Sequence, residues 1–288
     1  MTAVFSHSQK PRSLAHTLSR AVLYLALTLG LVATLLPFMM MIFSSFKTNL
    51  EALRTPPTFW PEKFTFENYQ TIFTDPKLPL LRFYFNSAFV AFFNVISALF
   101  TSSLMGYIFA KFDFWGKRLF FGWFMATMMI PVQITMIPSY LILARLGLIN
   151  NLWGLIIFSL IDAFGIFLMR QFCQSFPNEL LDAGRIDGAS EWQIYWKIVL
   201  PQLGPALATL GILRFMFSWN AYLWPMIVLQ KIEVRTLPII LTWFNSAHAT
   251  QPALVMAANV LIVIPILIVF IVCQRWIIQG FTMSGLKG

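Results

Sequence analysis

The sequence is poor in charged residues, cysteine and histidine, and each shortage excludes a class of protein. Only 11% of its 288 residues are charged, less than half of the roughly 25% found in soluble domains, so a soluble fold of this size could not cover its surface. The two cysteines, Cys173 and Cys273, form no CxxC motif, and we interpret them as reduced and inert. The three histidines are too scattered to predict a metal site.

Motifs for catalysis and nucleotide binding are also missing. The sequence has no HExxH, no GxSxG and no paired membrane carboxylates, so it offers no catalytic residue for an intramembrane hydrolase. The tripeptide Gly116-Lys117-Arg118 resembles the end of a phosphate-binding loop. However, Lys111 stands where the first glycine belongs, and Arg118 replaces the magnesium-binding Ser or Thr. We therefore predict that the chain is not an enzyme and binds no ATP by this route.

Hydrophobic residues make up 58% of the chain and occur in runs long enough to cross a bilayer, which takes about 20 apolar residues as a helix. The net charge of +9 comes from basic residues between these runs, with no block of five like charges. This pattern predicts membrane topology rather than nucleic-acid binding. We predict an all-α polytopic membrane protein with six transmembrane helices, at residues 21–43, 85–110, 119–143, 152–169, 203–228 and 253–276.

Six spans place both termini on one side of the membrane, and the basic residues favour the cytoplasm. Counted this way, 11 Lys and Arg residues lie inside and 8 outside, which agrees in sign with the positive-inside rule. The first run is too long for a signal peptide and has no cleavage site, so it is predicted to stay as an anchor. The predicted organisation is a cytoplasmic segment 1–20, a first transmembrane helix 21–43, an extracytoplasmic loop 44–83, a five-helix core 84–276 and a cytoplasmic tail 277–288.

The inner connector 177–201 is the most informative segment. We expect two short helices around a turn, with an N-cap at Asn178, a turn at Asp187-Gly188 and a capping box from Ser190 to Gln193. Pro201 is expected to lie in the first turn of the following span or to interrupt it. An amphipathic helix on the lipid headgroups is the alternative interpretation, but that interpretation does not require the Asp-Gly turn.

The same connector resembles the EAA loop of ABC importer permeases, whose pattern is close to E-A-A-x-x-D-G-A-x8-I-x-L-P. The match falls on Asp182-Ala183-Gly184, on Asp187-Gly188-Ala189 and on Ile198-Val199-Leu200-Pro201. Asp182 replaces the family's Glu and Gly184 replaces its second Ala, at a helix cost of about 1 kcal/mol for the glycine. The resemblance implies that Asp182-Ala183-Gly184 and Asp187-Gly188-Ala189 belong to a coupling helix that docks into a cleft of an ATPase subunit.

Other segments resemble the maltose-type carbohydrate permeases. They are Ser218-Trp219-Asn220-Ala221-Tyr222-Leu223-Trp224-Pro225, Ser45-Phe46-Lys47 followed by Asn68-Tyr69, and the ending that starts at Gln274-Arg275-Trp276. The resemblance implies the type I ABC importer permease fold in a prokaryotic plasma membrane. It also implies a second, non-identical permease subunit, two copies of a cytoplasmic ATPase subunit that holds ATP and magnesium, and an extracytoplasmic solute-binding protein. The chain would then form half of a pathway for a carbohydrate or related polyol.

Polar side chains inside the predicted spans are costly and therefore functional candidates. They are Asn94, Gln133, Asp162, Arg214, Asn220 and Asn259. For Asn94 and Asn259 we favour a hydrogen bond between helices. For Asp162 and Arg214 we favour a structural pair. Prolines 131, 138, 225 and 265 predict helix kinks.

Amide and aromatic side chains around Asn220 form the candidate substrate pathway. Trp219, Asn220, Tyr222 and Trp224 together offer hydrogen bonds to hydroxyls and flat apolar faces to sugar rings. An aromatic belt at the outer interface is the competing interpretation and is equally favoured for Trp224. Two other function classes are alternatives. A self-contained secondary transporter or channel predicts internal repeats and coupling-ion carboxylates, and an intramembrane enzyme needs a nucleophile and a base. The solute itself stays open between disaccharides, oligosaccharides, polyols and glycerol phosphates.

Overall fold

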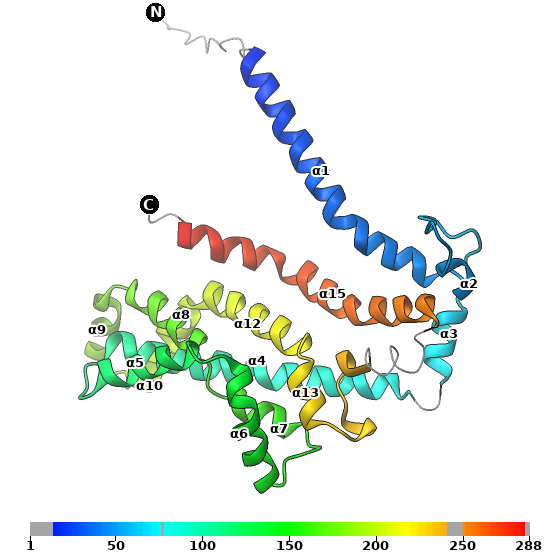
Figure 1. The fold of residues 1–288 in the computed structure, drawn as a ribbon. Coiled ribbons are helices and arrows are strands. Elements are labelled where there is room, and N and C mark those ends of the chain that lie inside the picture. Colours follow the sequence, from blue (N-terminus) through cyan, green and yellow to red (C-terminus); the bar gives the residue numbers. More distant parts are fainter. Residues whose placement is uncertain (1–13, 76–77, 241–249, 286–288) are drawn as a thin grey trace, which may run out of the picture.

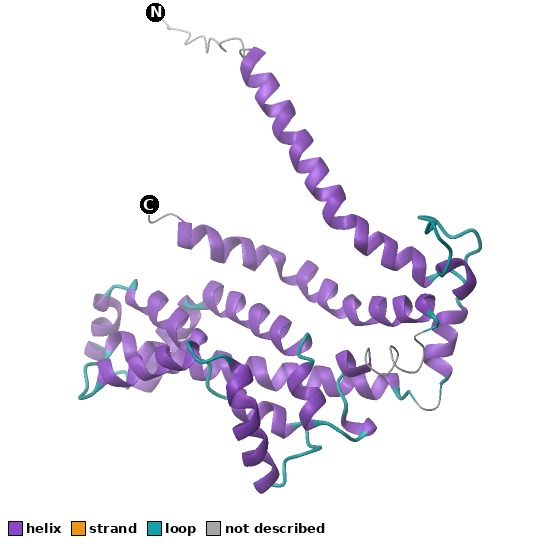
Figure 2. Ribbon diagram, viewed as in Figure 1, coloured by secondary structure: helices purple, strands orange, loops and turns teal. Residues whose placement is uncertain are grey.

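A computed structural model describes residues 14–75, 78–240 and 250–285, and every regular element in these ranges is a helix (Figures 1 and 2). The predicted segment 1–20 lies mostly outside these ranges, as do residues 286–288 of the predicted tail. The first elements are α1 (Leu14–Ser45), α2 (Asn49–Ala52), α3 (Glu67–Thr74), α4 (Leu80–Lys111), α5 (Lys117–Met128) and α6 (Val132–Arg145).

The chain continues through a series of shorter helices to one long C-terminal helix. These elements are α7 (Trp153–Ile156), η1 (Ile157–Ser159), α8 (Ala163–Gln174), α9 (Asn178–Ile186), α10 (Glu191–Ile194), the π-helical turn η2 (Tyr195–Val199), α11 (Leu200–Gln202), α12 (Gly204–Trp219), α13 (Leu223–Val228), η3 (Ile232–Val234), η4 (Leu237–Ile239) and α15 (Pro252–Gly285). The helix α15 therefore continues past the predicted end of the last span at residue 276.

The described residues contain three to six candidate membrane spans. Helices α1, α4 and α15 are each long and apolar enough to cross a bilayer. Three further candidates are bent pairs: α5 with α6 at 101°, α7 and η1 with α8 at 42°, and α10 to α11 with α12 at 77°. The predicted runs 119–143 and 152–169 thus fall on the first two pairs but are not continuous helices. The predicted run 203–228 is wrong in its bounds, because the third pair covers residues 191–219 and residues 223–228 belong to α13.

Proline explains the sharpest of these breaks. Pro131 stands between α5 and α6 as the N-cap of α6, with ψ of 131°, and a residue before or at such a position leaves the helical region readily. Pro201 lies in the short α11 before the 77° bend, and Pro205 lies in the first turn of α12 after it. Since proline lacks the N–H that would bond four residues back, Pro205 accounts for the break between α11 and α12. Pro138 and Pro265 lie inside helices. The kink expected at the end of the fifth span is wrong in position, because α12 ends at Trp219 and Pro225 belongs to α13.

Helix α4 is the centre of the bundle. It packs against α8 and α12, and α12 in turn packs against α15. Two glycines allow α4 and α8 to approach closely: a Cβ on Gly106 would stand 2.5 Å from the Cβ of Met169, and one on Gly165 would stand 2.2 Å from the Ser102 Oγ. Small residues at helix interfaces serve this purpose in membrane proteins, where close packing replaces the hydrophobic effect.

Helix α1 diverges from the bundle. It approaches α15 at its C-terminal end and leaves it toward the N-terminus, as Figure 1 shows. None of the residues in its most apolar window is buried by the described chain. Its apolar side chains therefore face lipid or another molecule rather than the bundle.

The connector between α1 and α4 is folded, and two sequence motifs meet in it. The Asn68 amide donates hydrogen bonds to the carbonyl oxygens of Ser45 at 2.8 Å and of Lys47 at 2.9 Å. The Ser45 and Tyr69 hydroxyls are 2.8 Å apart, and the rings of Phe46 and Tyr69 lie with centroids at 5.3 Å. Ser45-Phe46-Lys47 and Asn68-Tyr69 thus hold the end of α1 against α3.

A buried carboxylate organises the rest of this connector. The Glu51 side chain is only 4% exposed, and its Oε1 accepts hydrogen bonds from the Thr58 hydroxyl at 3.0 Å and the Glu62 backbone N–H at 2.9 Å. Burial raises the pKa of Glu51, but these hydrogen bonds and the nearby Lys47 charge outweigh it and hold the pKa below its ordinary value. Lys47 is itself buried and donates to the Thr58 carbonyl oxygen.

Candidate functional site

The connector after α8 folds as two helices joined by a turn, which we call the α9–α10 hairpin. Helix α9 starts directly after Pro177, which is its N-cap residue. The predicted N-cap at Asn178 is therefore wrong by one residue. The Asn178 side chain instead accepts a hydrogen bond from the Lys111 Nζ at 2.7 Å, and that ammonium also donates to the Phe176 carbonyl oxygen at 2.6 Å. The last turn of α4 is thus fastened to the start of α9.

The end of α9 is a Schellman motif built on Gly188. The Gly188 N–H donates to the Arg185 carbonyl oxygen, and the Ala189 N–H donates to the Gly184 carbonyl oxygen, both at 3.0 Å. Gly188 has φ of +78°, the left-handed conformation that this motif requires and that glycine adopts without strain. The predicted turn is confirmed. Its cause is backbone hydrogen bonding and the glycine, because the exposed Asp187 carboxylate has no hydrogen-bond or ion-pair partner among the described residues.

Helix α10 begins with the predicted capping box. The Ser190 Oγ accepts from the Gln193 N–H at 3.3 Å, and the Gln193 Oε1 accepts from the Ser190 N–H at 2.8 Å. These reciprocal bonds satisfy two orphan donors of the helix start. The turn and the capping box together fix where α9 ends and α10 begins.

The inner face of the hairpin is apolar and packed. Leu181 and Ile194 are buried in a core cluster with Met169 of α8 and Leu210 of α12. Gly184 packs directly on the second helix: a Cβ there would lie 2.9 Å from the Ile198 Cδ1 and 3.3 Å from the Ile194 Cγ1. The glycine in place of the family's alanine thus lets these isoleucines approach α9 closely.

The outer face of the hairpin carries exposed apolar side chains. Ile186 at the tip is 86% exposed, Trp192 is 53% exposed and Leu180 is 45% exposed. Large apolar side chains gathered on an exposed segment mark interaction surfaces. Leu181 does not belong to this face, as an interfacial helix would require, because it is 3% exposed.

Ionic contacts join the two helices of the hairpin to each other and to α4. The Arg185 guanidinium donates to the Glu191 Oε1 at 2.7 Å and to the Asp182 Oδ1 at 2.8 Å. These two hydrogen bonds raise the pKa of Arg185 further above its ordinary value. The other Glu191 oxygen, Oε2, accepts from the Tyr107 hydroxyl of α4 at 3.2 Å. All six predicted residues from Asp182 to Gly184 and from Asp187 to Ala189 therefore lie in one hairpin with fixed geometry.

The second candidate site, around Asn220, is spread over two helices. Trp219 is 4% exposed, stacks on Phe215 with ring centroids at 5.4 Å and donates its indole N–H to the Ile262 carbonyl oxygen at 3.3 Å. It therefore belongs to the core rather than to an open surface. Asn220 is exposed at the end of α12, where its amide donates to the Met216 carbonyl oxygen at 2.8 Å. Tyr222 is exposed, and Trp224 on α13 is half-buried with its ring near Phe158.

Predicted polar contacts between helices are confirmed at two places. The Asn94 amide donates to the Ser218 Oγ at 2.9 Å and its oxygen accepts from the Ser159 hydroxyl, so Asn94 joins α4, η1 and α12. Arg214 Nε and Asp162 Oδ2 are 3.5 Å apart, within ion-pair distance but without hydrogen-bond geometry. No hydrogen bond to Asn259 is seen among the described residues, so its predicted contact stays a prediction. Gln133 is exposed on α6.

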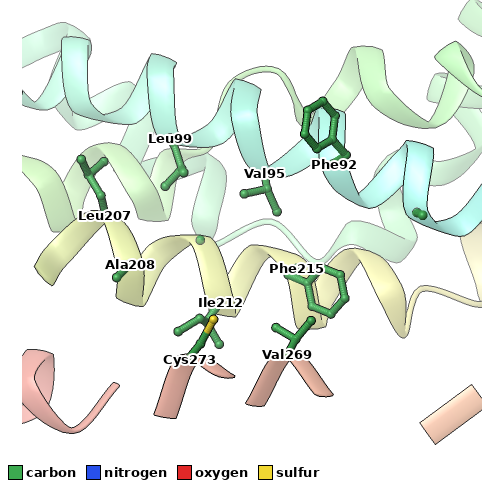
Figure 3. Close-up of a pocket in the computed structure, with 11 residues that line it drawn as sticks. Phe92, Val95, Leu99, Leu207, Ala208, Ile212, Phe215, Val269 and Cys273 are labelled. Carbon is green, nitrogen blue, oxygen red and sulfur yellow. The ribbon is translucent and has the colours of Figure 1, made fainter. Parts of the chain in front are cut away.

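An apolar groove lies elsewhere in the described chain. It measures about 560 Å³ and runs between α4, α12 and α15 (Figure 3). Its walls are apolar side chains such as Phe92, Leu99, Ile212 and Val269, with Cys273 at one edge (Figure 3). A solute rich in hydroxyl groups would find almost no hydrogen-bond partner there, so this groove does not fit such a ligand.

Sequence reasoning found the hairpin but missed the contacts that hold it. The sequence did not predict the contacts of Tyr107, Lys111 and Glu191, although each pairs with the hairpin or belongs to it. The charges at the end of one span and next to a capping box were the available signals. No local pattern links Tyr107 to Glu191, which are 84 residues apart.

An all-helical polytopic membrane protein with a packed, surface-exposed hairpin fastened to its central span has the form of a transport subunit. The comparison with known families makes this specific. The chain belongs to the family of binding-protein-dependent transport system inner membrane components, whose model matches residues 98–283.

The chain is similar to known permeases, and the similarity covers nearly the whole length of each. The chain is 36% identical over 254 residues to the arabinooligosaccharides transport system permease protein AraQ of Halalkalibacterium halodurans, covering 88% of this chain and 91% of the relative. It is 32% identical over 272 residues to the lactose transport system permease protein LacG of Rhizobium radiobacter, covering 94% and 98%. It is 31% identical over 267 residues to the sn-glycerol-3-phosphate transport system permease protein UgpE of Yersinia enterocolitica, covering 91% and 95%.

A solved structure shares the fold. The chain aligns with a crystal structure of a bacterial ABC transporter involved in the import of the acidic polysaccharide alginate, with a TM-score of 0.81 and 28% identity. The alignment covers 93% of this chain and 99% of that one. The chain is accordingly a permease subunit of a binding-protein-dependent ABC importer, a multi-pass protein of the bacterial inner membrane. It is the transporter's membrane component and not its ATPase.

Proposed function

We propose that this chain is one of two non-identical permease subunits of a carbohydrate importer and lines half of its translocation pathway. The names of the relatives support this class of solute, since they carry arabinooligosaccharides, lactose and sn-glycerol-3-phosphate. An alginate transporter shares the fold. The common chemistry of these solutes is a hydroxyl-rich, flexible polyol or sugar chain.

The proposed topology has six spans in the type I importer arrangement, with both termini in the cytoplasm. Helices α1, α4 and α15 supply three spans and the three bent pairs supply the others. The modest excess of basic residues on the proposed inner side supports this orientation. The segments 1–20 and 277–288 would then lie in the cytoplasm, the loop 44–83 outside, and 84–276 would form the five-helix core.

We propose that the α9–α10 hairpin docks onto one of two ATPase subunits. One observation carries this proposal: the hairpin has a rigid, satisfied inner face, and an outer face that exposes Ile186 almost completely. A hairpin that served only as a lipid-surface helix would not need a Schellman turn and a capping box. It would also not need the hydrogen bonds that join α9 to α10 and α10 to α4. ATP and magnesium would bind to the ATPase partner, and this chain would hold neither.

The proposed substrate pathway includes Asn220, Tyr222 and Trp224, which follow the end of α12. Asn220 and Tyr222 are exposed, and the half-buried Trp224 ring lies beside Phe158. Trp219 supports them from the core, where its indole N–H bonds to the Ile262 carbonyl oxygen. The solute would approach this region from an extracytoplasmic binding protein.

The test compares two substitutions in the assembled importer. In Asn220→Ala, solute uptake should fall while ATPase capture by the permease stays normal, because the pathway and the hairpin are separate. In Ile186→Asp, ATPase capture should fall, because a carboxylate replaces the exposed apolar tip. Normal capture by Ile186→Asp, at equal membrane abundance, would contradict hairpin docking, and unchanged uptake by Asn220→Ala would remove Asn220 from the pathway.

A further inference from the structure

We propose that Glu191 is a positioning residue that transmits the motion of the docked hairpin to helix α4, through Arg185 on one side and Tyr107 on the other. This inference rests on the proposed docking of the α9–α10 hairpin. The residue touches neither solute nor nucleotide. Its role is to fix the angle between α9 and the membrane helix, so that a displacement of one becomes a displacement of the other.

The geometry places one carboxylate between two elements. Glu191 Oε1 accepts from the Arg185 Nε of α9 at 2.7 Å, and Oε2 accepts from the Tyr107 hydroxyl of α4 at 3.2 Å. Arg185 is held in turn by the Asp182 Oδ1 at 2.8 Å, one turn earlier on α9. The path from α9 to α4 is therefore continuous: the Arg185–Glu191 bond is a short, charge-assisted hydrogen bond, and the Tyr107–Glu191 bond is a longer one.

A second contact next to the first makes the connection resistant to rotation. The Tyr195 hydroxyl, in the π-helical turn η2, lies 2.8 Å from the Ser103 Oγ of α4. Ser103 and Tyr107 are four residues apart and so lie on one face of α4. The rings of Tyr107 and Tyr195 stack with centroids at 6.0 Å. Two neighbouring attachments on one helix face define an orientation, whereas one attachment alone would permit pivoting.

The opposite end of α9 is also tied to α4. Lys111 bonds to the Asn178 side chain at 2.7 Å and to the Phe176 carbonyl oxygen at 2.6 Å. Both ends of α9 thus follow the last two turns of α4. Because α4 has 32 residues without a break, it is about 48 Å long and can carry a displacement across the whole bilayer.

The exposure of these groups separates positioning from folding. The side chains of Arg185 and Glu191 are 40% and 45% exposed, and an ion pair with this exposure contributes little to global stability. Leu181, Ile194 and Tyr195 are buried instead and hold the hairpin together. Loss of the Glu191 carboxylate should therefore leave the fold and the docking surface in place while the hairpin loses its fixed angle to α4.

The experiment measures coupling in the complete importer reconstituted in lipid vesicles, as solute imported per ATP hydrolysed. Glu191→Ala should retain ATPase capture within about twofold and lower the coupling ratio about fivefold. Glu191→Gln keeps neutral hydrogen bonds and should fall between Glu191→Ala and the wild type. Tyr107→Phe keeps the buried ring, removes one hydrogen bond and should lower the ratio in the same direction. Asp113→Asn is the matched control, because it breaks a 3.0 Å ion pair with Lys117 near the same end of α4 but outside the hairpin.

A double-mutant cycle decides whether Glu191 and Tyr107 act through one connection. If they do, Tyr107→Phe combined with Glu191→Ala should be no worse than Glu191→Ala alone. Additive losses, or a wild-type coupling ratio in Glu191→Ala, would overturn the positioning role and leave hairpin docking intact. Loss of ATPase capture in Glu191→Ala would also overturn it, because Glu191 would then be a docking residue. Normal capture and uptake in Ile186→Asp would instead remove the docking on which the inference rests.

Discussion

The substitution Gly188→Val tests the turn of the α9–α10 hairpin most directly. Gly188 has φ of +78°, and a Cβ built there meets no atom within 4 Å. The cost of valine is therefore one of backbone conformation and not of collision. An L-residue in this region costs about 1–2 kcal/mol, and a β-branched side chain is an outlier there that brings the cost toward about 3 kcal/mol.

The chain can escape this strain only by leaving the Schellman turn. It then loses the two hydrogen bonds from Gly188 and Ala189, at about 1 kcal/mol each. Either way the docked conformation becomes less populated, by about 5- to 150-fold for 1–3 kcal/mol. Membrane insertion should be unaffected, because α1, α4 and α15 carry their own apolar surface.

The assay is co-purification of the ATPase with tagged permease from membranes, beside solute uptake and an immunoblot for abundance. Gly188→Val should lose ATPase capture and uptake at near-normal abundance, Gly188→Ala should lose less, and Gly188→Asn should lose least because asparagine tolerates the left-handed region.

Gly147→Val is the matched control for this series. Gly147 has φ of +69°, meets no atom within 4 Å and closes α6 with the same hydrogen-bond pattern, far from the hairpin in sequence. It should keep ATPase capture. Equal loss of capture in both variants, or full capture and uptake in Gly188→Val, would refute the reasoning.

Three further substitutions test separate parts of the structure. Gly184→Ala should retain transport, because the gain in helix propensity of about 1 kcal/mol offsets the small shift required of the flexible Ile198 Cδ1; a loss of uptake comparable to Gly184→Leu would contradict this. Asp162→Asn should lower the free energy of unfolding of the purified protein by up to about 3 kcal/mol, because it leaves the Arg214 charge unpaired. Adding Arg214→Gln should restore part of this loss. A double variant less stable than the single one would count against the pair. Glu51 has a lowered pKa in the folded chain, so its carboxylate stabilises the connector between α1 and α4 at pH values above its ordinary pKa, and this stabilisation is lost as the pH falls from there through the lowered pKa. The unfolding temperature should therefore drop more between pH 7 and pH 4 for the wild type than for Glu51→Gln, and equal drops would exclude Glu51 as the cause.

The approximate location of the membrane helices could be predicted from the sequence, because each appears as a continuous run of apolar residues. The prolines indicate that helices bend at Pro131 and near Pro201, but not how sharply, since the apolar character continues on both sides of each bend. The 42° break between η1 and α8 has no proline to mark it. Proline is tolerated in membrane helices when neighbours satisfy the freed backbone, so its presence alone does not locate a bend of 101°. Only the packing of the whole chain determines which prolines break a helix and which are accommodated.

In the candidate site, too, local contacts could be predicted and long-range contacts could not. The capping box of Ser190 and the turn at Gly188 depend on residues no more than five apart, and the sequence predicts both correctly. The bond from Tyr107 to Glu191 joins residues 84 apart, and the contact of Asn94 with Ser218 joins residues 124 apart. Such pairs follow from the tertiary fold, and a single sequence holds no local pattern that reveals them.

The π-helical turn η2 sets the orientation of the α9–α10 hairpin relative to α12 through the number of residues that it contains. One extra residue is accommodated in Tyr195–Val199 compared with a regular α-helix. Removing that residue would rotate everything before it by about 100° around the helix axis relative to α12. The Tyr195 hydroxyl would then turn away from Ser103, and the exposed tip at Ile186 would point in another direction. A deletion that leaves composition, charge and hydropathy almost unchanged would thus turn the exposed face of the α9–α10 hairpin in another direction, so the number of residues in this turn sets the direction of that face.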